Sequence, residues 1–145
     1  MREILFRGKR EGIPEWIFGT GLLYDEVNTW IVNNPIGKAI AFGETRDVVR
    51  LETIGQYTGL TDKNGKKIFE GDIVWFEDES PSNYEYHDCT EMRCGAIEYG
   101  DNCFYITNRI AVEMEDLIYD GKLDVEVIGN IHDNPELLKE GAGNG

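Results

Sequence analysis

Short apolar runs, each closed by turn-forming residues, recur along the chain. In the first part of the sequence they lie at 4–6, 16–18, 22–24 and 29–32, and Gly, Pro, Asn or Asp residues separate most of them. Apolar runs of this length between turn residues are typical of β-strands. We therefore predict a mainly β protein with short antiparallel strands and little helix.

The most informative stretch runs from Ile54 to Val74. Asn64-Gly65 is the strongest hairpin signal in the chain, because Asn followed by Gly tolerates the two positive φ angles of a type I′ turn. The run from Ile73 to Phe76 is apolar without interruption, which predicts a strand buried on both faces. A calcium loop is excluded there, because Lys66 and Lys67 occupy positions where such a loop needs an oxygen ligand and a glycine.

The last part of the chain carries one strand signal and one helix signal. Leu123 to Val127 alternates apolar and acidic residues, as a strand with one wet face does. Asn134-Pro135-Glu136 combines a capping residue, a residue suited to the first helical position and an acid that favours the positive end of the helix dipole. A short helix is therefore predicted after the last strand.

These signals divide the chain into regions. We predict an N-terminal β region over residues 1–53, an SH3-like small β-barrel over 54–140 that ends in the short helix, and a flexible tail over 141–145. Within the barrel region, the polar and acidic residues 77–92 are predicted to form a loop. The SH3-like barrel is an analogy of fold, and a fold does not specify a function.

Three motifs carry a family resemblance: IGQYTGLTDKNGKKIFEGDIV at 54–74, EVIGNIHDNPELL at 126–138 and the opening REILFRGKR. With them the chain closely resembles the YopX family of phage and prophage proteins over nearly its whole length, apart from a variable middle at 77–99. The resemblance implies a small, soluble, phage-encoded protein with a largely β fold that self-associates. It implies no established activity and no catalytic or binding residues.

The charge of the chain, −14 in total, is distributed unevenly. Residues 1–67 hold ten Lys or Arg and nine Asp or Glu, a net charge of +1, whereas residues 68–145 hold four and nineteen, a net charge of −15. Nucleic acid requires a basic footprint, so we expect no direct nucleic-acid partner. The sequence has no membrane-spanning apolar stretch, no signal-peptide core and no disulfide framework, so we expect a cytoplasmic protein with no membrane partner.

One group of residues has the composition of a metal site. His87, Cys89, Cys94 and Cys103 are separated by one, four and eight residues, which does not match the paired ligands of structural zinc sites. We interpret the cysteines as buried hydrophobic residues beside a surface histidine, and we expect no metal and no cofactor. A catalytic Cys–His pair is also disfavoured, because the other histidine, His132, lies in a turn-rich strand exit. We therefore expect no enzyme.

The leading hypothesis is a non-enzymatic accessory protein of a phage or prophage, a β module that binds a macromolecule and forms homo-oligomers. Its candidate partner-binding residues are acids of the predicted loop: Glu77, Asp78, Glu79 and Glu85. A first alternative is an acidic mimic of DNA that inhibits a host nucleic-acid-binding protein, with a basic protein as its partner. A second alternative is a small metal-dependent enzyme or zinc module.

Overall fold

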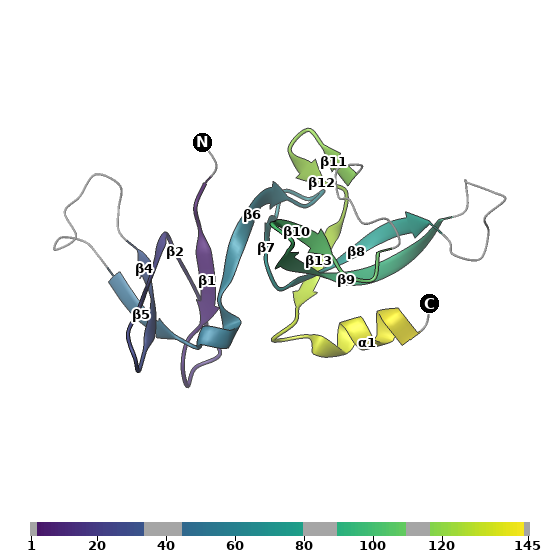
Figure 1. Cartoon of the computed structure of the whole chain (residues 1–145). Coiled ribbons are helices and arrows are strands. Elements are labelled where there is room, and N and C mark those ends of the chain that lie inside the picture. Colours follow the sequence, from purple (N-terminus) through teal and green to yellow (C-terminus); the bar gives the residue numbers. More distant parts are fainter. Residues whose placement is uncertain (1–2, 34–44, 80–89, 110–116, 144–145) are drawn as a thin grey trace. The chain divides into compact units, whose positions relative to one another are not determined.

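The structure is a computed structural model that describes residues 3–33, 45–79, 90–109 and 117–143 (Figure 1). The chain divides into two compact units, Met1–Gly59 and Leu60–Gly145. Strands dominate both units, and the predicted mainly β fold with a short C-terminal helix is confirmed. The boundary lies inside strand β6 (Gly55–Thr61), slightly later than the sequence suggested, because the strand pairs within both units.

The N-terminal unit contains two small antiparallel sheets. In one, β1 pairs with β2 and with the start of β6; in the other, β4 lies between β3 and β5. A short 3₁₀ turn, η1, connects β5 to β6. The elements are β1 (Phe6–Lys9), β2 (Trp16–Gly19), β3 (Gly21–Tyr24), β4 (Thr29–Asn33), β5 (Thr45–Val49) and η1 (Leu51–Thr53).

A glycine allows these two sheets to pack closely. Ile31 in β4 is 1 % exposed and is one of the buried hydrophobic residues of this unit. A Cβ atom on Gly19 would lie 2.5 Å from Ile31 Cγ2 and 2.5 Å from the carbonyl oxygen of Val32. Any larger residue at Gly19 would therefore push β4 away from β2.

The C-terminal unit is built on a four-stranded antiparallel sheet with the order β10-β9-β8-β13. The helix α1 packs against β9, and β12 pairs with both β11 and the end of β6 (Figure 1). The elements are β7 (Lys67–Phe69), β8 (Asp72–Glu79), β9 (Thr90–Gly100), β10 (Cys103–Ile106), β11 (Ile118–Tyr119), β12 (Lys122–Leu123), β13 (Glu126–Asn130) and α1 (Pro135–Gly143).

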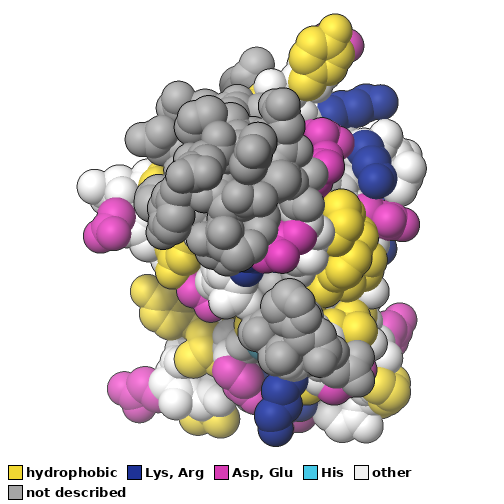
Figure 2. All heavy atoms as spheres, turned by 90° about the vertical axis from the view of Figure 1, so that its right-hand side faces the viewer, with side chains coloured by type: hydrophobic (Ala, Val, Ile, Leu, Met, Phe, Trp, Pro, Cys, Tyr) yellow, Lys and Arg dark blue, Asp and Glu magenta, His cyan; other side chains and the backbone are white. Residues whose placement is uncertain are grey.

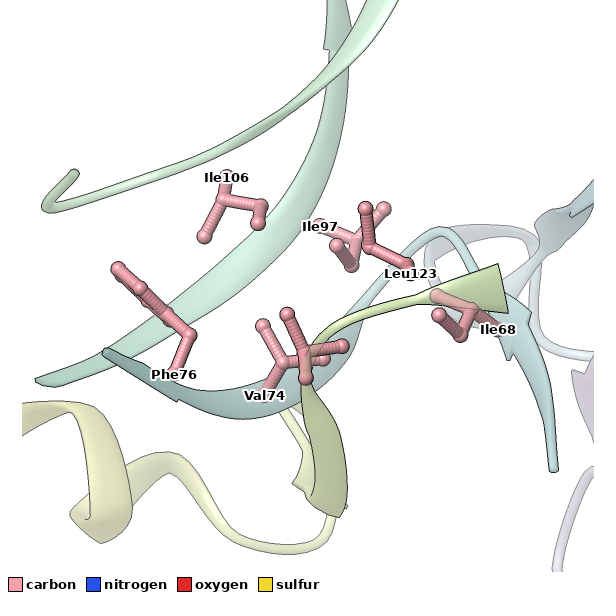
Figure 3. Close-up of a cluster of buried hydrophobic side chains, with 7 residues drawn as sticks. Ile68, Val74, Phe76, Ile97, Ile106 and Leu123 are labelled. Carbon is pink, nitrogen blue, oxygen red and sulfur yellow. The ribbon is translucent and has the colours of Figure 1, made fainter. Parts of the chain in front are cut away.

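One hydrophobic cluster forms the core of the C-terminal unit. Side chains from five strands and from the segment before β13 point toward one another in it (Figure 3). Burying each of them contributes about 1.5–3 kcal/mol relative to an exposed position. The cluster consists of Ile68, Val74, Phe76, Ile97, Ile106, Leu123 and Val125.

The turn at Asn64-Gly65 differs from the predicted type I′ turn. Gly65 has a positive φ of 85°, but Asn64 does not belong to the residues with positive φ. The Gly65 amide donates to the carbonyl of Asp62 at 2.9 Å, and the Asp62 amide donates to the carbonyl of Lys66 at 2.7 Å. This is the three-residue connection in which a type I turn is followed by a left-handed glycine.

Three further features depart from the sequence prediction. β8 and β9 pair from Ile73↔Ala96 to Glu79↔Thr90, so residues 77–79 and 90–92 are strand rather than loop. The helix reaches Gly143, into the predicted tail. Within the described residues the sheet of the C-terminal unit is open, and no closed barrel is detected.

Candidate functional site

The predicted partner-binding acids occupy different environments. Glu77 is exposed on β8, whereas Asp78 is 5 % exposed. Asp78 Oδ2 lies 3.5 Å from Nε of Arg93, whose Nη2 also bonds Glu91 Oε1. Because Asp78 and Glu91 face each other in register, Arg93 offsets a repulsion that would otherwise weaken the strand pair. Asp78 thus stabilises the pairing of β8 with β9 and does not lie on the surface.

Of the other two predicted acids, Glu79 lies within the described residues. Glu79 is the last residue of β8 and pairs in register with Thr90. Glu85 lies outside the described residues. Of the four predicted residues, Glu77 alone is therefore seen to expose its carboxylate in the part of the chain that the structure describes.

The residues with the composition of a metal site give no evidence of one. Cys94 is buried, and burial raises the pKa of its thiol; Cys103 is exposed. Cys103 pairs with Gly100, which lies about 20 Å along β9 from Cys94 at ~3.3 Å per residue. His87 and Cys89 lie outside the described residues, and among those described no group of three or more His, Cys, Asp or Glu could hold an ion.

Asp62, in the longest motif, is a structural carboxylate. Its side chain is 1 % exposed; Oδ1 accepts hydrogen bonds from the amides of Asn64 and Lys66, both at 2.9 Å, and Oδ2 accepts one from Val127 at 3.0 Å. Burial alone raises the pKa of Asp62, but these three N–H groups and the Lys66 charge hold it below its ordinary value. Asp62 thereby joins the turn before β7 to β13.

The motif at 126–138 also stabilises a local turn. Asn130 Oδ1 accepts hydrogen bonds from the amides of His132 and Asp133 at 3.0 and 2.9 Å, which forms the turn between β13 and α1. A Cβ on Gly129 would lie 2.5 Å from Oδ1 of Asn134, so glycine is needed where the chain folds back. The side-chain oxygen of Asn130 is therefore used within the turn.

A hollow of about 250 Å³ lies in the N-terminal unit, where the β3–β4 turn meets η1. Four carboxylates from three segments line it, together with aliphatic side chains and Arg50. We call it the acidic hollow; its carboxylates belong to Glu11, Asp25, Glu26 and Glu52. It contains no histidine, cysteine, lysine or serine, and it is smaller than the usual small-molecule pocket of about 300–1,000 Å³.

Hydrogen bonds hold the walls of the acidic hollow in place. Oδ1 of Asp25 accepts bonds from the amides of Val27 and Asn28 at 2.8 and 2.7 Å, which closes the β3–β4 turn and lowers the pKa of Asp25. On the other side, Arg50 Nη2 lies 2.7 Å from Oε1 of Glu52. The Asp25 carboxylate is therefore ionised at neutral pH, but no nucleophile and base stand together among the residues that line the hollow.

A second surface lies on β1 and β2. Arg7 pairs in register with Phe18, and Lys9 with Trp16, so these four side chains share one face of the hairpin. The Arg7 guanidinium carbon lies 4.7 Å from the centroid of the Trp16 ring, and Lys9 Nζ lies 5.9 Å from it. Phe18 is 48 % exposed, whereas Arg7 is buried, with 8 % of its surface exposed. We call these four residues the cation–aromatic face.

Sequence analysis did not identify this face, although its signal was available. Basic residues stand at positions 7 and 9, after the apolar run at 4–6, and aromatic residues stand at 16 and 18 in the next run. Since side chains two apart on a strand share a face, this spacing would have placed them together if the register had been known.

Comparison with protein families identifies the chain. The family model described as YopX protein matches residues 5–139. The chain belongs to the YopX family. Among solved structures, protein EF1440 from Enterococcus faecalis resembles this YopX protein with a TM-score of 0.54 and 27 % sequence identity, covering 93 % of this chain and 97 % of that one. Among curated proteins, none matches this YopX chain.

The YopX match spans both units, so both the acidic hollow and the cation–aromatic face lie on the family domain. On the face drawn in Figure 2, Asp and Glu side chains are spread among hydrophobic ones and do not gather into a single patch. Among the helices that the structure describes, none is long and apolar enough to cross a membrane.

Proposed function

We propose that this YopX protein is a non-enzymatic accessory protein of a phage or prophage. It acts in the cytoplasm of the bacterial host by binding a basic macromolecular partner, and it also associates with itself. The binding of the basic partner belongs to the acidic hollow.

The composition of the acidic hollow carries this proposal. Its rim includes two strongly exposed aliphatic side chains, Val27 at 84 % and Leu51 at 70 %. Protein interfaces combine an apolar centre with polar groups around it, and exposed apolar side chains beside a hollow are typical of such contacts. Four carboxylates against one arginine give the hollow a negative charge, which favours Lys or Arg side chains of a partner.

The described residues also support a binding role over catalysis. Their exposed cysteine, Cys103, lies on the β10 hairpin, whereas His132 lies in the turn before α1. Side chains that activate each other must lie within hydrogen-bond reach, about 2.6–3.2 Å. Cys103 and His132 lie on different elements of the C-terminal unit, which favours a binding role over a Cys–His reaction.

An affinity capture from host lysate tests the proposal. The immobilised wild-type protein is expected to retain a basic protein at low salt and to release it at high salt, because screening weakens exposed charge pairs. Glu26→Lys and Val27→Asp, both on the rim of the hollow, should reduce the retained amount at least about tenfold. Quantitative mass spectrometry of the eluates is the measurement.

Asp124→Lys provides the matched control, because Asp124 is an exposed acid of the C-terminal unit. It should retain the same protein as the wild type. A partner that all variants retain equally, or an empty wild-type eluate at low salt, would contradict the proposed role of the acidic hollow.

A second candidate function is inhibition of a host nucleic-acid-binding protein by charge mimicry. The net charge of −15 on residues 68–145 favours it, because a DNA-binding surface is basic. In this case the captured protein should bind duplex DNA, and added DNA should displace it from the immobilised protein. A captured protein that DNA does not displace would exclude mimicry while leaving the binding role intact.

A further inference from the structure

We infer that Asn64 is a site of spontaneous deamidation, and that the hydrogen-bonded turn anchored by Asp62 controls how fast it reacts. The reaction uses only water and the backbone nitrogen of the residue that follows the asparagine. The site lies in the C-terminal unit, outside the acidic hollow, so the inference does not depend on the proposed partner.

Deamidation is a reaction between neighbouring groups of the chain. The backbone nitrogen of the next residue attacks Cγ of the asparagine, and the new N–Cγ bond closes a succinimide ring. The side-chain nitrogen leaves as ammonia and carries away the proton of the backbone N–H. Water then opens the ring at either carbonyl, which gives aspartate or isoaspartate, and nothing is oxidised or reduced.

Gly65 makes Asn64 suited to this reaction. Glycine has no Cβ, so its nitrogen approaches the Cγ of the preceding asparagine without obstruction. Among the asparagines that the structure describes, Asn64 alone precedes a glycine. Both residues of the pair are exposed, so water reaches the ring once it forms. Asn64 thus combines a reactive sequence with an accessible position.

The folded turn restrains the attacking nitrogen. The amide of Gly65 donates to the carbonyl oxygen of Asp62 at 2.9 Å, so its N–H is already engaged. The amides of Asn64 and Lys66, on either side of it, both donate to Oδ1 of Asp62 at 2.9 Å. Asp62 therefore holds three successive N–H groups of the turn. Cyclisation has to release the Gly65 amide, so it follows local opening of the turn.

The product disturbs the same anchor. Isoaspartate continues the main chain through its side-chain carbonyl, which lengthens the link between residues 64 and 65 by a carbon atom. The longer link displaces the amides of Gly65 and Lys66 from Asp62, which is 1 % exposed and needs such donors. Oδ2 of Asp62 accepts the amide of Val127, so deamidation loosens the connection between this turn and β13.

Peptide mass spectrometry of the full chain during incubation in mildly alkaline buffer tests the reaction. In urea, Asn64 should convert to aspartate and isoaspartate, and Gly65→Ala should slow the conversion at least about tenfold because its Cβ obstructs the attack. In the folded wild type, conversion at Asn64 should be measurable but at least about tenfold slower than in urea, because the turn must open first.

Two variants of the folded protein separate opening of the turn from a general loss of stability. Asp62→Asn weakens the anchor and should speed conversion at Asn64 at least about fivefold. Ile97→Val, the matched control, removes a methylene from the core of the same unit and should leave the rate within about twofold of the wild type. Circular dichroism spectra that match the wild type show that both variants are folded.

The effect on stability is measured on the modified protein itself. Each deamidation adds a negative charge, so ion-exchange chromatography separates the products. The sequence has a second Asn-Gly pair, Asn144-Gly145, outside the described residues, and an Asn144→Gln background keeps the charge change specific to residue 64. The fraction with isoaspartate at 64 should unfold at a lower urea concentration than the unmodified fraction, because donors to a buried carboxylate are lost.

Each measurement has a result that would overturn the inference. Equal rates at Asn64 in buffer and in urea would show that the turn exerts no control, and no conversion in the folded wild type would show that the native protein has no such site. If Ile97→Val accelerates conversion as much as Asp62→Asn does, global unfolding and not the turn sets the rate. If the modified and unmodified fractions unfold at the same urea concentration, deamidation leaves the anchor at Asp62 intact.

Discussion

At the scale of single residues, buried carboxylates in short turns account for much of the order of the C-terminal unit. Asp62 accepts three backbone hydrogen bonds that connect a turn to β13, and Asp72 accepts one from the amide of Phe69 at 2.7 Å. Both side chains are 1 % exposed. A buried carboxylate is tolerated when N–H donors replace its lost hydration, and the turns supply those donors.

Substitution of Asp62 should reveal this role. Asp62→Asn replaces one accepting oxygen by an NH₂ group that faces a backbone N–H, so we expect a loss of about 2–4 kcal/mol in the free energy of unfolding. Urea denaturation followed by fluorescence measures it. Asp124→Asn, at an exposed position, should change the value by less than about 0.5 kcal/mol. Equal effects at the two positions would contradict the structural role of Asp62.

The pKa of Asp62 predicts how the stability difference between the wild type and Asp62→Asn depends on pH. The folded state holds the pKa of Asp62 below its ordinary value of 3.8. Its ionised form therefore stabilises the fold above that value, and the contribution is lost as pH falls through the lowered pKa. The advantage of the wild type over Asp62→Asn should shrink across this acidic range.

At the scale of elements, close approach between strands decides which positions require glycine. Gly19 and Gly21 are separated by one residue, yet their surroundings differ. Gly19 faces β4, where a Cβ would meet Ile31 and Val32, whereas nothing lies within 4 Å of a Cβ on Gly21. The packing of two sheets, and not strand propensity, therefore explains the glycine in β2.

Alanine substitution at these two positions should separate the effects. Gly19→Ala forces β2 and β4 apart, and we expect a loss of about 1–3 kcal/mol in the free energy of unfolding. Gly21→Ala, the matched control, should lie within about 0.5 kcal/mol of the wild type or stabilise slightly. Thermal or urea denaturation compares them. Similar losses at both positions would show that glycine is needed for backbone reasons and not for sheet packing.

At the scale of the whole molecule, two units have separate hydrophobic interiors. The interior of the N-terminal unit includes Ile31 and Val49, and that of the C-terminal unit is the cluster around Phe76 and Ile97 (Figure 3). The surplus of acids adds a repulsive charge of −14 to the chain, which favours solubility and opposes compactness. Each interior must therefore stabilise its own unit against this repulsion.

Hydrogen exchange can test whether the units unfold separately. Ile31→Val should cost about 1 kcal/mol and raise exchange of the slowest amides of the N-terminal unit about fivefold, with little effect on the other unit. Ile97→Val, the matched change in the C-terminal unit, should have the converse effect. Mass-spectrometric exchange on the full chain measures both. If either variant accelerates both units equally, the molecule unfolds as one cooperative body.

The sequence alone determined the class of fold and the turn positions, because both depend on residues close together in the chain. The short apolar runs predicted antiparallel strands, and Asn134-Pro135 predicted the start of the last helix. The family motifs predicted membership of the YopX family, which the match over residues 5–139 confirms. Local propensity also predicted a turn at residues 64 and 65, although the predicted turn type was wrong.

Only the tertiary structure decided which side chains are exposed and which meet. Asp78 and Glu77 are neighbours with the same charge, yet strand register turns one inward to Arg93 and the other outward. The same register gathers Lys9, Trp16 and Phe18 on one face, and loop geometry brings Glu11 to Asp25 and Glu52 in the acidic hollow. Register and packing depend on contacts between distant segments, and a sequence read locally does not contain them.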